Sequence, residues 1–195
     1  VSNPLDIMTQ LAFKKSGFPK NRVFGMAGIL DTARLRSFMA LELNCRVEET
    51  EAMILGGHGD AMVPLEQYCK VKGKPISTLL PKDRVDALMQ RARDGGAEIV
   101  KYLKTGSAYY APSSGVVAML KSIIRDEKSV IPSACYLEGE YGLRDVYIGV
   151  PAVIGKCGVE KIVELEITKE QKDALHKSAG VVRGNVGMVL SLPQK

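Results

Sequence analysis

Three side chains suited to proton transfer and to carboxylate binding stand close together in the first third of the sequence. Asp31 and Arg34 are spaced i,i+3, and His58 follows in the segment Gly56-Gly57-His58-Gly59-Asp60. An imidazole exchanges its proton near neutral pH, and a neighbouring carboxylate raises its pKa into the working range. A guanidinium holds a carboxylate through two parallel hydrogen bonds. The set is suited to moving a proton on a small hydroxy- or keto-acid.

Each of these signals also has an ordinary structural interpretation. Asp31 and Arg34 would project from nearly the same face of a helix, which is also typical of an N-cap aspartate and a surface ion pair. A histidine after a strand is commonly a core or surface residue without a chemical role. The glycines around His58 favour a site, because a backbone without Cβ atoms lets a ligand approach closely. Asn3, before Pro4, is either a turn residue or an amide offered to a substrate.

The remaining composition excludes several classes of function. The chain has 195 residues and a net charge of +5, but its basic residues are scattered and Trp is absent, so we expect no nucleic-acid partner. No apolar run approaches the roughly 20 residues that cross a bilayer, so we expect no membrane partner. The four cysteines contain no Cys-x-x-Cys pair, which predicts no metal site and reduced thiols in the cytoplasm.

The elements that must position these residues form one α+β domain over residues 1–195. Residues 1–3 are predicted to end a strand, and Pro4 opens a helix that Gly17 can close. A second helix is expected after Asp31, and a strand at 52–55 leads directly into the glycines before His58.

The rest of the chain alternates long helices with a β-rich segment. A hairpin is expected over 63–76 with its turn at 72–74, followed by helices over 82–104 and 113–126. Residues 129–167 are rich in β-branched residues and predict an antiparallel sheet, and Thr168 can cap a last helix.

Four segments, taken in order, resemble the lactate/malate dehydrogenase family. They are Val1-Ser2-Asn3-Pro4-Leu5-Asp6, Asp31-Thr-Ala-Arg34-Leu, Gly56-Gly-His58-Gly-Asp60-Ala-Met-Val-Pro64 and Ser107-Ala108-Tyr109-Tyr110-Ala111-Pro112. The resemblance covers essentially the whole chain. The last two segments look like those of bacterial, lactate-dehydrogenase-like malate dehydrogenases, whereas lactate enzymes more often carry Glu at the position of Gly57.

The resemblance implies a role for each matching residue. His58 would be the catalytic proton donor and acceptor, Asp31 its carboxylate partner, and Arg34 the clamp on the substrate carboxylate. Two further sets follow by position. Asn3 and Ala108 would contact or enclose the substrate, and the cofactor side would be lined by Val1, Ser2 and Asn3.

The resemblance also implies a fold, a reaction and partners. We expect the α+β C-terminal domain of the family, with an antiparallel sheet packed against long helices, in an NAD-dependent enzyme that interconverts (S)-malate and oxaloacetate. A dimer or tetramer is expected. The family's glycine-rich Rossmann half would precede Asn3 and does not occur in this sequence, so residues 1–3 match its last part, and we expect the isolated chain to be inactive. Alternatives are a domain for lactate or another 2-hydroxy acid, and a non-catalytic assembly fragment.

Overall fold

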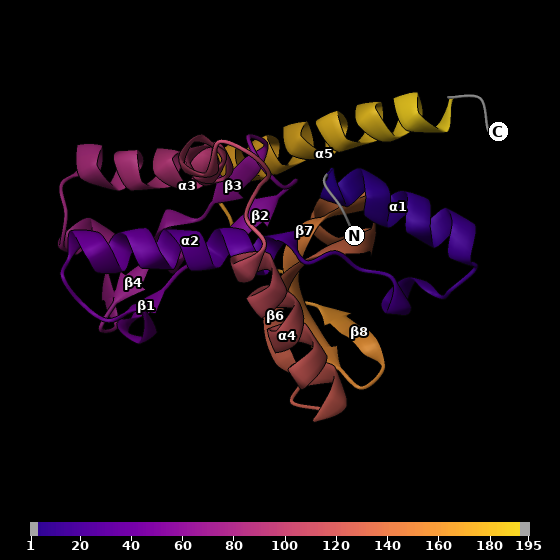
Figure 1. Ribbon diagram of the computed structural model, residues 1–195, viewed down its shortest axis with the longest axis horizontal. Helices are drawn as coiled ribbons and strands as arrows, with labels where there is room; N and C mark the ends of the chain where they lie inside the picture. Colours follow the sequence, from indigo (N-terminus) through magenta and orange to yellow (C-terminus); the bar gives the residue numbers. More distant parts are fainter. Residues whose placement is uncertain (1–3, 192–195) are drawn as a thin grey trace.

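The computed structural model describes residues 4–191, which form an α+β fold of two antiparallel sheets covered by long helices (Figure 1). The α-helices are α1 (Leu5–Ser16), α2 (Ala27–Glu42), α3 (Lys82–Leu103), α4 (Tyr110–Ile124) and α5 (Lys169–Leu190). The strands are β1 (Thr50–Glu51), β2 (Ile54–Gly56), β3 (Met62–Pro64), β4 (Lys70–Val71), β5 (Lys74–Pro75), β6 (Ser129–Glu138), β7 (Arg144–Gly155) and β8 (Gly158–Ile162). Short 3-10 turns lie at Lys20–Arg22, Val47–Glu49, Glu66–Tyr68, Ile76–Thr78 and Glu140–Gly142.

The larger sheet is organised around β7. One edge of β7 pairs with β6 along almost its whole length, and the other edge pairs with β2 at Gly149 and with β8 further along. Strand β3 then continues the sheet beyond β2. Helix α5 runs along one side of the sheet, whereas α4 and the β7–β8 hairpin extend to the other (Figure 1). The smaller sheet has the order β1-β4-β5.

Strand β2 is shared between two hydrophobic cores. Leu55 packs into the core formed by the large sheet and α5, and Ile54 packs into the core between α2 and α3. Successive side chains of a strand point to opposite faces, so a three-residue strand can contact both cores. The loop that follows β2, which carries His58, is therefore anchored from two sides.

Most of the expected elements are present. The strand expected over 52–55 is β2, which covers Ile54–Gly56, and three larger differences remain. Helix α2 begins at Ala27, before Asp31, because Gly28 has no Cβ and lets the first turn lie against Pro132 of β6. Asp31 is therefore inside the helix, and its interpretation as an N-cap is wrong. Helix α4 begins at Tyr110, with Pro112 in the first turn, where its missing N–H costs no hydrogen bond.

The third difference concerns the expected hairpin over 63–76. Only β4 and β5 form it, around Lys72 and Gly73, which both have positive φ as a tight two-residue turn requires. Val63 belongs instead to β3, which pairs with β2. The expected antiparallel sheet is confirmed as β6 to β8. Thr168 caps α5 through a reciprocal capping box with Gln171, also as expected.

Candidate active site

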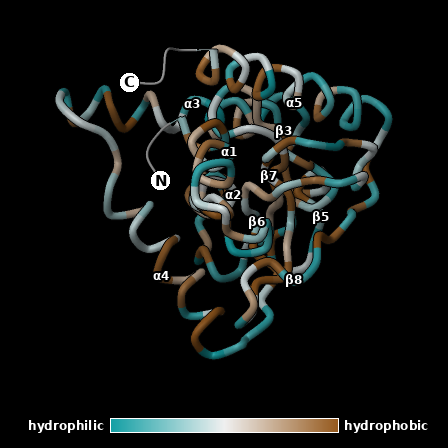
Figure 2. The backbone as a smooth tube through the Cα atoms, turned by 90° about the vertical axis from the view of Figure 1, so that its right-hand side faces the viewer, coloured by the Kyte–Doolittle hydropathy of each residue, from teal (hydrophilic) through white to brown (hydrophobic). Residues whose placement is uncertain are grey.

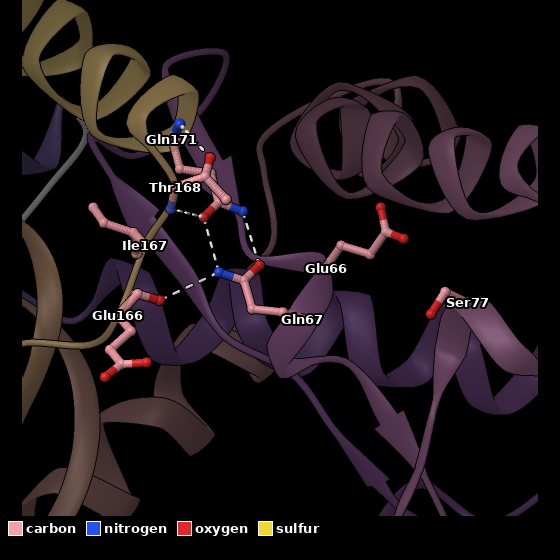
Figure 3. A pocket seen from close by; sticks show the side chains of 7 residues that line it. All are labelled: Glu66, Gln67, Ser77, Glu166, Ile167, Thr168 and Gln171. Atoms are coloured by element: carbon pink, nitrogen blue, oxygen red, sulfur yellow. Dashed lines mark hydrogen bonds between the residues drawn. The ribbon is translucent and has the colours of Figure 1, made fainter.

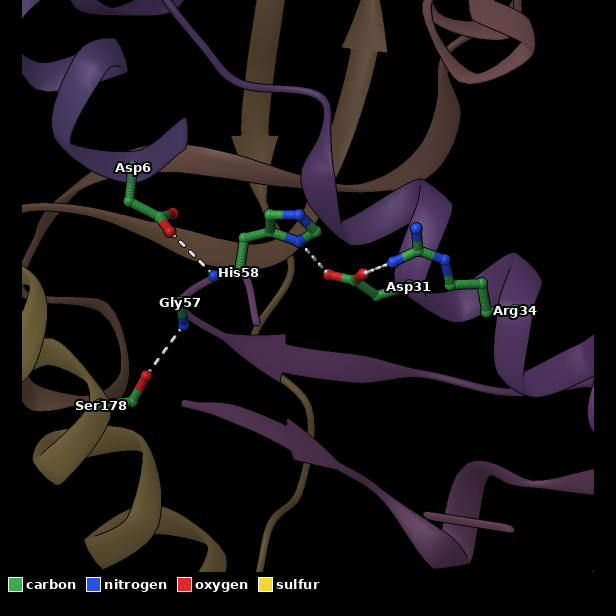
Figure 4. Close-up of polar contacts among 6 residues, drawn as sticks. All are labelled: Asp6, Asp31, Arg34, Gly57, His58 and Ser178. Atoms are coloured by element: carbon green, nitrogen blue, oxygen red, sulfur yellow. Dashed lines mark hydrogen bonds and ion pairs between the residues drawn. The ribbon is translucent and has the colours of Figure 1, made fainter. Parts of the chain in front are cut away.

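The structure brings Asp31, Arg34 and His58 into one cluster. Nδ1 of His58 lies 2.8 Å from Oδ2 of Asp31, and Nη1 of Arg34 donates to Oδ1 of the same carboxylate at 3.3 Å (Figure 4). The side chain of Asp31 is 3% exposed and that of His58 is 23% exposed. A buried carboxylate thus holds an imidazole that solvent or a ligand can still reach.

This geometry determines which ring nitrogen can do chemistry. An ionised carboxylate only accepts hydrogen bonds, so Nδ1 carries the hydrogen that faces Asp31, and Nε2 of the neutral ring is left as a proton acceptor. The hydrogen bond to Asp31 raises the pKa of His58 above its ordinary value, while burial of the ring opposes that rise. His58 is therefore set up to take a proton at Nε2 and to be stabilised as an imidazolium.

The His58 loop is fixed through its backbone by two helices far apart in the sequence. The N–H of His58 donates to Oδ2 of Asp6 in α1 at 2.8 Å, and the N–H of Gly57 donates to Oγ of Ser178 in α5, also at 2.8 Å (Figure 4). A Cβ on Gly57 would lie 3.0 Å from Val182, so the absence of a side chain there lets α5 approach the loop.

Arg34 is seated by the packing of α2 against α3. A Cβ at Gly95 of α3 would lie 3.2 Å from Cδ of Arg34, so this glycine makes room for the arginine stem between the helices. Within the described residues the guanidinium makes one hydrogen bond, to Asp31, although it has five N–H donors. Arg34 can therefore also take a carboxylate ligand.

The other predicted site residues are Val1, Ser2, Asn3 and Ala108. Val1, Ser2 and Asn3 lie outside the described residues. Ala108 is half-buried in the connection between α3 and α4, and its contact with a substrate stays a prediction.

Sequence reasoning missed two residues that hold the loop, Asp6 and Ser178. In α1, Asp6, Thr9 and Gln10 are spaced i,i+3,i+4 and all are buried. The same spacing of polar residues is more typical of a solvated helix face. In the sequence, the only feature that drew attention to Asp6 was its place in the family-like segment that begins at Val1.

A pocket of about 510 Å³ lies apart from this cluster, beside the first turn of α5 (Figure 3). Its central feature is a pair of amides, Gln67 and Gln171, which donate to one another in both directions at 2.8 Å. Gln171 also accepts from the N–H of Thr168, so the pair links the capping box of α5 to the 3-10 turn at Glu66–Tyr68. We interpret this pocket as part of the contact that fixes the start of α5 to that turn, with no ligand-binding role.

Residues 4–191 contain neither a candidate metal cluster nor a candidate membrane-spanning helix. No group of three or more His, Cys, Asp or Glu in that range is placed to share a metal ion. None of the helices in that range combines the length and apolar character needed to cross a membrane.

Comparison with known proteins gives consistent matches. A family model for the lactate/malate dehydrogenase alpha/beta C-terminal domain matches residues 29–191. A malate dehydrogenase of Chloroherpeton thalassium is 54% identical over 194 residues, which are 100% of this chain and 63% of that protein. The chain thus spans less than two thirds of the length of this relative.

Solved structures agree with this assignment of the fold. The malate dehydrogenase of Salinibacter ruber superposes with a TM-score of 0.95 at 45% identity, covering 97% of this chain and 62% of that one. The lactate dehydrogenase of Cryptosporidium parvum, complexed with lactic acid and nicotinamide adenine dinucleotide, has a TM-score of 0.96 at 36% identity and covers 99% and 62%.

Proposed function

The chain belongs to the lactate/malate dehydrogenase family, and we propose that it forms the catalytic and substrate-binding part of an NAD-dependent malate dehydrogenase. The reaction would interconvert (S)-malate and oxaloacetate. One observation carries the proposal: the 2.8 Å contact between the His58 imidazole and the buried Asp31 carboxylate, with Arg34 on the same carboxylate.

The chain's own residues account for proton transfer and substrate orientation. His58 takes the proton of the malate C2 hydroxyl at Nε2, and Asp31 stabilises the imidazolium that results. Arg34 grips the C1 carboxylate with two parallel hydrogen bonds and so orients the C2 carbon. Bound NAD would supply the hydride acceptor, and proton transfer of this kind contributes about 10²–10⁴-fold to the rate.

Substrate identity rests on similarity rather than on these three side chains, which would serve lactate equally well. The 54% identity to a malate dehydrogenase, against 36% to a lactate dehydrogenase, favours malate. Lactate or another 2-hydroxy acid is the alternative substrate. A non-catalytic assembly role is the alternative function.

The proposed partners are a nucleotide-binding half and further copies of the protein. A dimer or tetramer is supported by the apolar face of α4, where Val117, Leu120 and Ile124 are 62%, 48% and 79% exposed. Figure 2 shows hydrophobic positions recurring along the α4 backbone. The cysteines of the described residues are free thiols, which fits a cytoplasmic enzyme.

Malate-dependent formation of NADH by the full-length protein tests the reaction. We expect turnover that is lost in His58→Ala, a clear preference for malate over lactate, and no appreciable turnover by residues 1–195 alone. The last expectation follows because nicotinamide must sit about 3–3.5 Å from the reacting carbon, and residues 1–195 lack the Gly-x-Gly-x-x-Gly turn that anchors it. Robust turnover by the isolated chain would contradict this expectation.

Calorimetric titration with oxamate tests the substrate clamp separately. Two charge-assisted hydrogen bonds, at about 1.5–3 kcal/mol each, predict that Arg34→Ala weakens binding by roughly 100-fold or more. Equal binding of oxamate by wild type and Arg34→Ala would show that Arg34 does not bind the substrate carboxylate.

A further inference from the structure

One buried carboxyl group beside the site has no role in the reaction described so far. Asp6 lies in the first turn of α1, is only 6% exposed, and accepts the backbone N–H of His58 through Oδ2 at 2.8 Å. Among residues 4–191 its other oxygen, Oδ1, is buried without a hydrogen-bond partner. A buried carboxyl group with an unpaired oxygen is costly, so its location against the His58 loop requires an explanation.

The charged groups that surround Asp6 come from the loop and from α2. The β2–β3 loop contributes His58 and α2 contributes Asp31, whereas α5 presents the uncharged Ser178 and Val182 near Gly57. His58 in turn faces Asp31, Asp6 and the positive charge of Arg34. The imidazole therefore has two carboxyl groups within electrostatic reach, and only one of them bonds its ring.

We propose that Asp6 is a positioning residue for His58, which fixes the backbone of the histidine and adds a second negative charge that favours the protonated imidazole. The inference rests on the proposed function, because it concerns the same proton transfer. The contact to the backbone sets where the ring is held, and the charge sets how strongly the ring keeps its proton.

The two contributions can be separated because the hydrogen bond survives loss of the charge. A protonated carboxyl group, or an amide, still offers a carbonyl oxygen to the His58 N–H. Burial raises the pKa of Asp6 to about 6, so its charge changes around that pH. Asp6→Asn therefore imitates the neutral state, and Asp6→Ala removes both charge and contact.

The experiment follows the His58 imidazole by NMR titration in the full-length protein labelled at histidine, with His58→Gln to assign its signals. We expect the His58 pKa to be lower in Asp6→Asn and Asp6→Ala than in wild type. We expect kcat for malate to fall about tenfold or more in Asp6→Ala, because a small misplacement of a catalytic group is costly, with a smaller change in KM.

Thr9→Val is the matched control on the same helix. Its hydroxyl is buried and bonds the carbonyl of Leu5 at 2.8 Å, so the variant loses a hydrogen bond of α1 without touching the loop. We expect its His58 titration and kcat to match those of wild type. An unchanged His58 pKa in both Asp6 variants would overturn the inference, and so would a control that moved it equally.

The titration needs no substrate, so the two proposals fail separately. A wild-type protein that does not oxidise malate would refute the proposed function, whereas the His58 pKa in Asp6→Asn tests the electrostatic link alone. Asp6→Asn keeps the backbone contact, which gives a folded variant for the test even if Asp6→Ala does not fold.

Discussion

Replacing Gly149, in the middle of β7, even by alanine should reduce both stability and catalysis, although Gly149 is far from His58 in sequence. It pairs with Gly56, the last residue of β2. A Cβ built on Gly149 would overlap the carbonyl oxygen of Gly56, at well under the 3.4 Å where ordinary contact begins. The obstructing atom belongs to the backbone, so no side-chain rotation can relieve the overlap, and β2 must move away from β7.

The size of the effect follows from this displacement. Moving β2 by about 1 Å forces an overpacked core to rearrange, at about 1–3 kcal/mol, and weakens a backbone hydrogen bond worth about 1 kcal/mol. We therefore expect Gly149→Ala to lower the free energy of unfolding by about 2–4 kcal/mol. His58 follows Gly56 by two residues, and a misplacement of about 1 Å can reduce catalysis about 100-fold.

Urea unfolding followed by far-UV circular dichroism, together with kcat for malate, measures both effects. Gly184→Ala in α5 is the matched control, since nothing lies within 4 Å of a Cβ there and the residue is exposed in a helix. That variant should gain about 0.5–1 kcal/mol of stability. A Gly149→Ala protein with wild-type stability and kcat would refute the reasoning, because β2 and β7 could not then be in contact at this position.

Two further predictions concern the carboxyl groups around His58. Asp31→Asn should reduce kcat about 10²–10⁴-fold and lower the His58 pKa, because Asp31 raises that pKa. In wild type, the stability that the Asp31–His58 pair adds is present below about pH 6.5. It is lost as pH rises through the pKa of His58 in the folded protein. An unshifted pH–rate profile in this variant would contradict the assignment of Asp31. Burial raises the pKa of Asp6 from 3.8 to about 6, so ionisation of Asp6 destabilises the folded protein. The cost is absent below pH 3.8, grows as pH rises, and reaches about 3 kcal/mol above pH 6. The difference in unfolding free energy between Asp6→Asn and wild type, measured by urea unfolding, should therefore grow by about 1.5 kcal/mol in favour of the variant from pH 5 to pH 8. If the two proteins changed in stability with pH in parallel, a raised pKa of Asp6 would be excluded.

The sequence could identify the reactive residues better than it could place them. The glycines around His58 and the i,i+3 spacing of Asp31 and Arg34 marked these residues as candidates, and the resemblance to the family assigned their roles. The 2.8 Å contact between Asp31 and His58 depends on how α2 packs against β6 and how β2 pairs with β7, and both depend on contacts between residues distant in the sequence. Local spacing contains no information about those contacts.

Other misses have identifiable physical causes. The N-cap interpretation of Asp31 failed because packing of Gly28 on Pro132 moved the helix start, which outweighs a local capping preference. Asp6 received no role because a polar helix face usually meets water, whereas this one meets the sheet and the His58 loop.

The two backbone contacts of the His58 loop have a consequence for biosynthesis. Ser178 follows Gly57 by 121 residues, so at about 5–20 residues per second it leaves the ribosome about 6–24 s later. During that interval the loop can reach Asp6 and Asp31 but has no partner on α5. Nascent chains that stop before α5 therefore carry every residue of the His58, Asp31 and Arg34 cluster without its final support. The candidate site reaches its final geometry only when α5 docks, which couples the support of the His58 loop to the synthesis of α5.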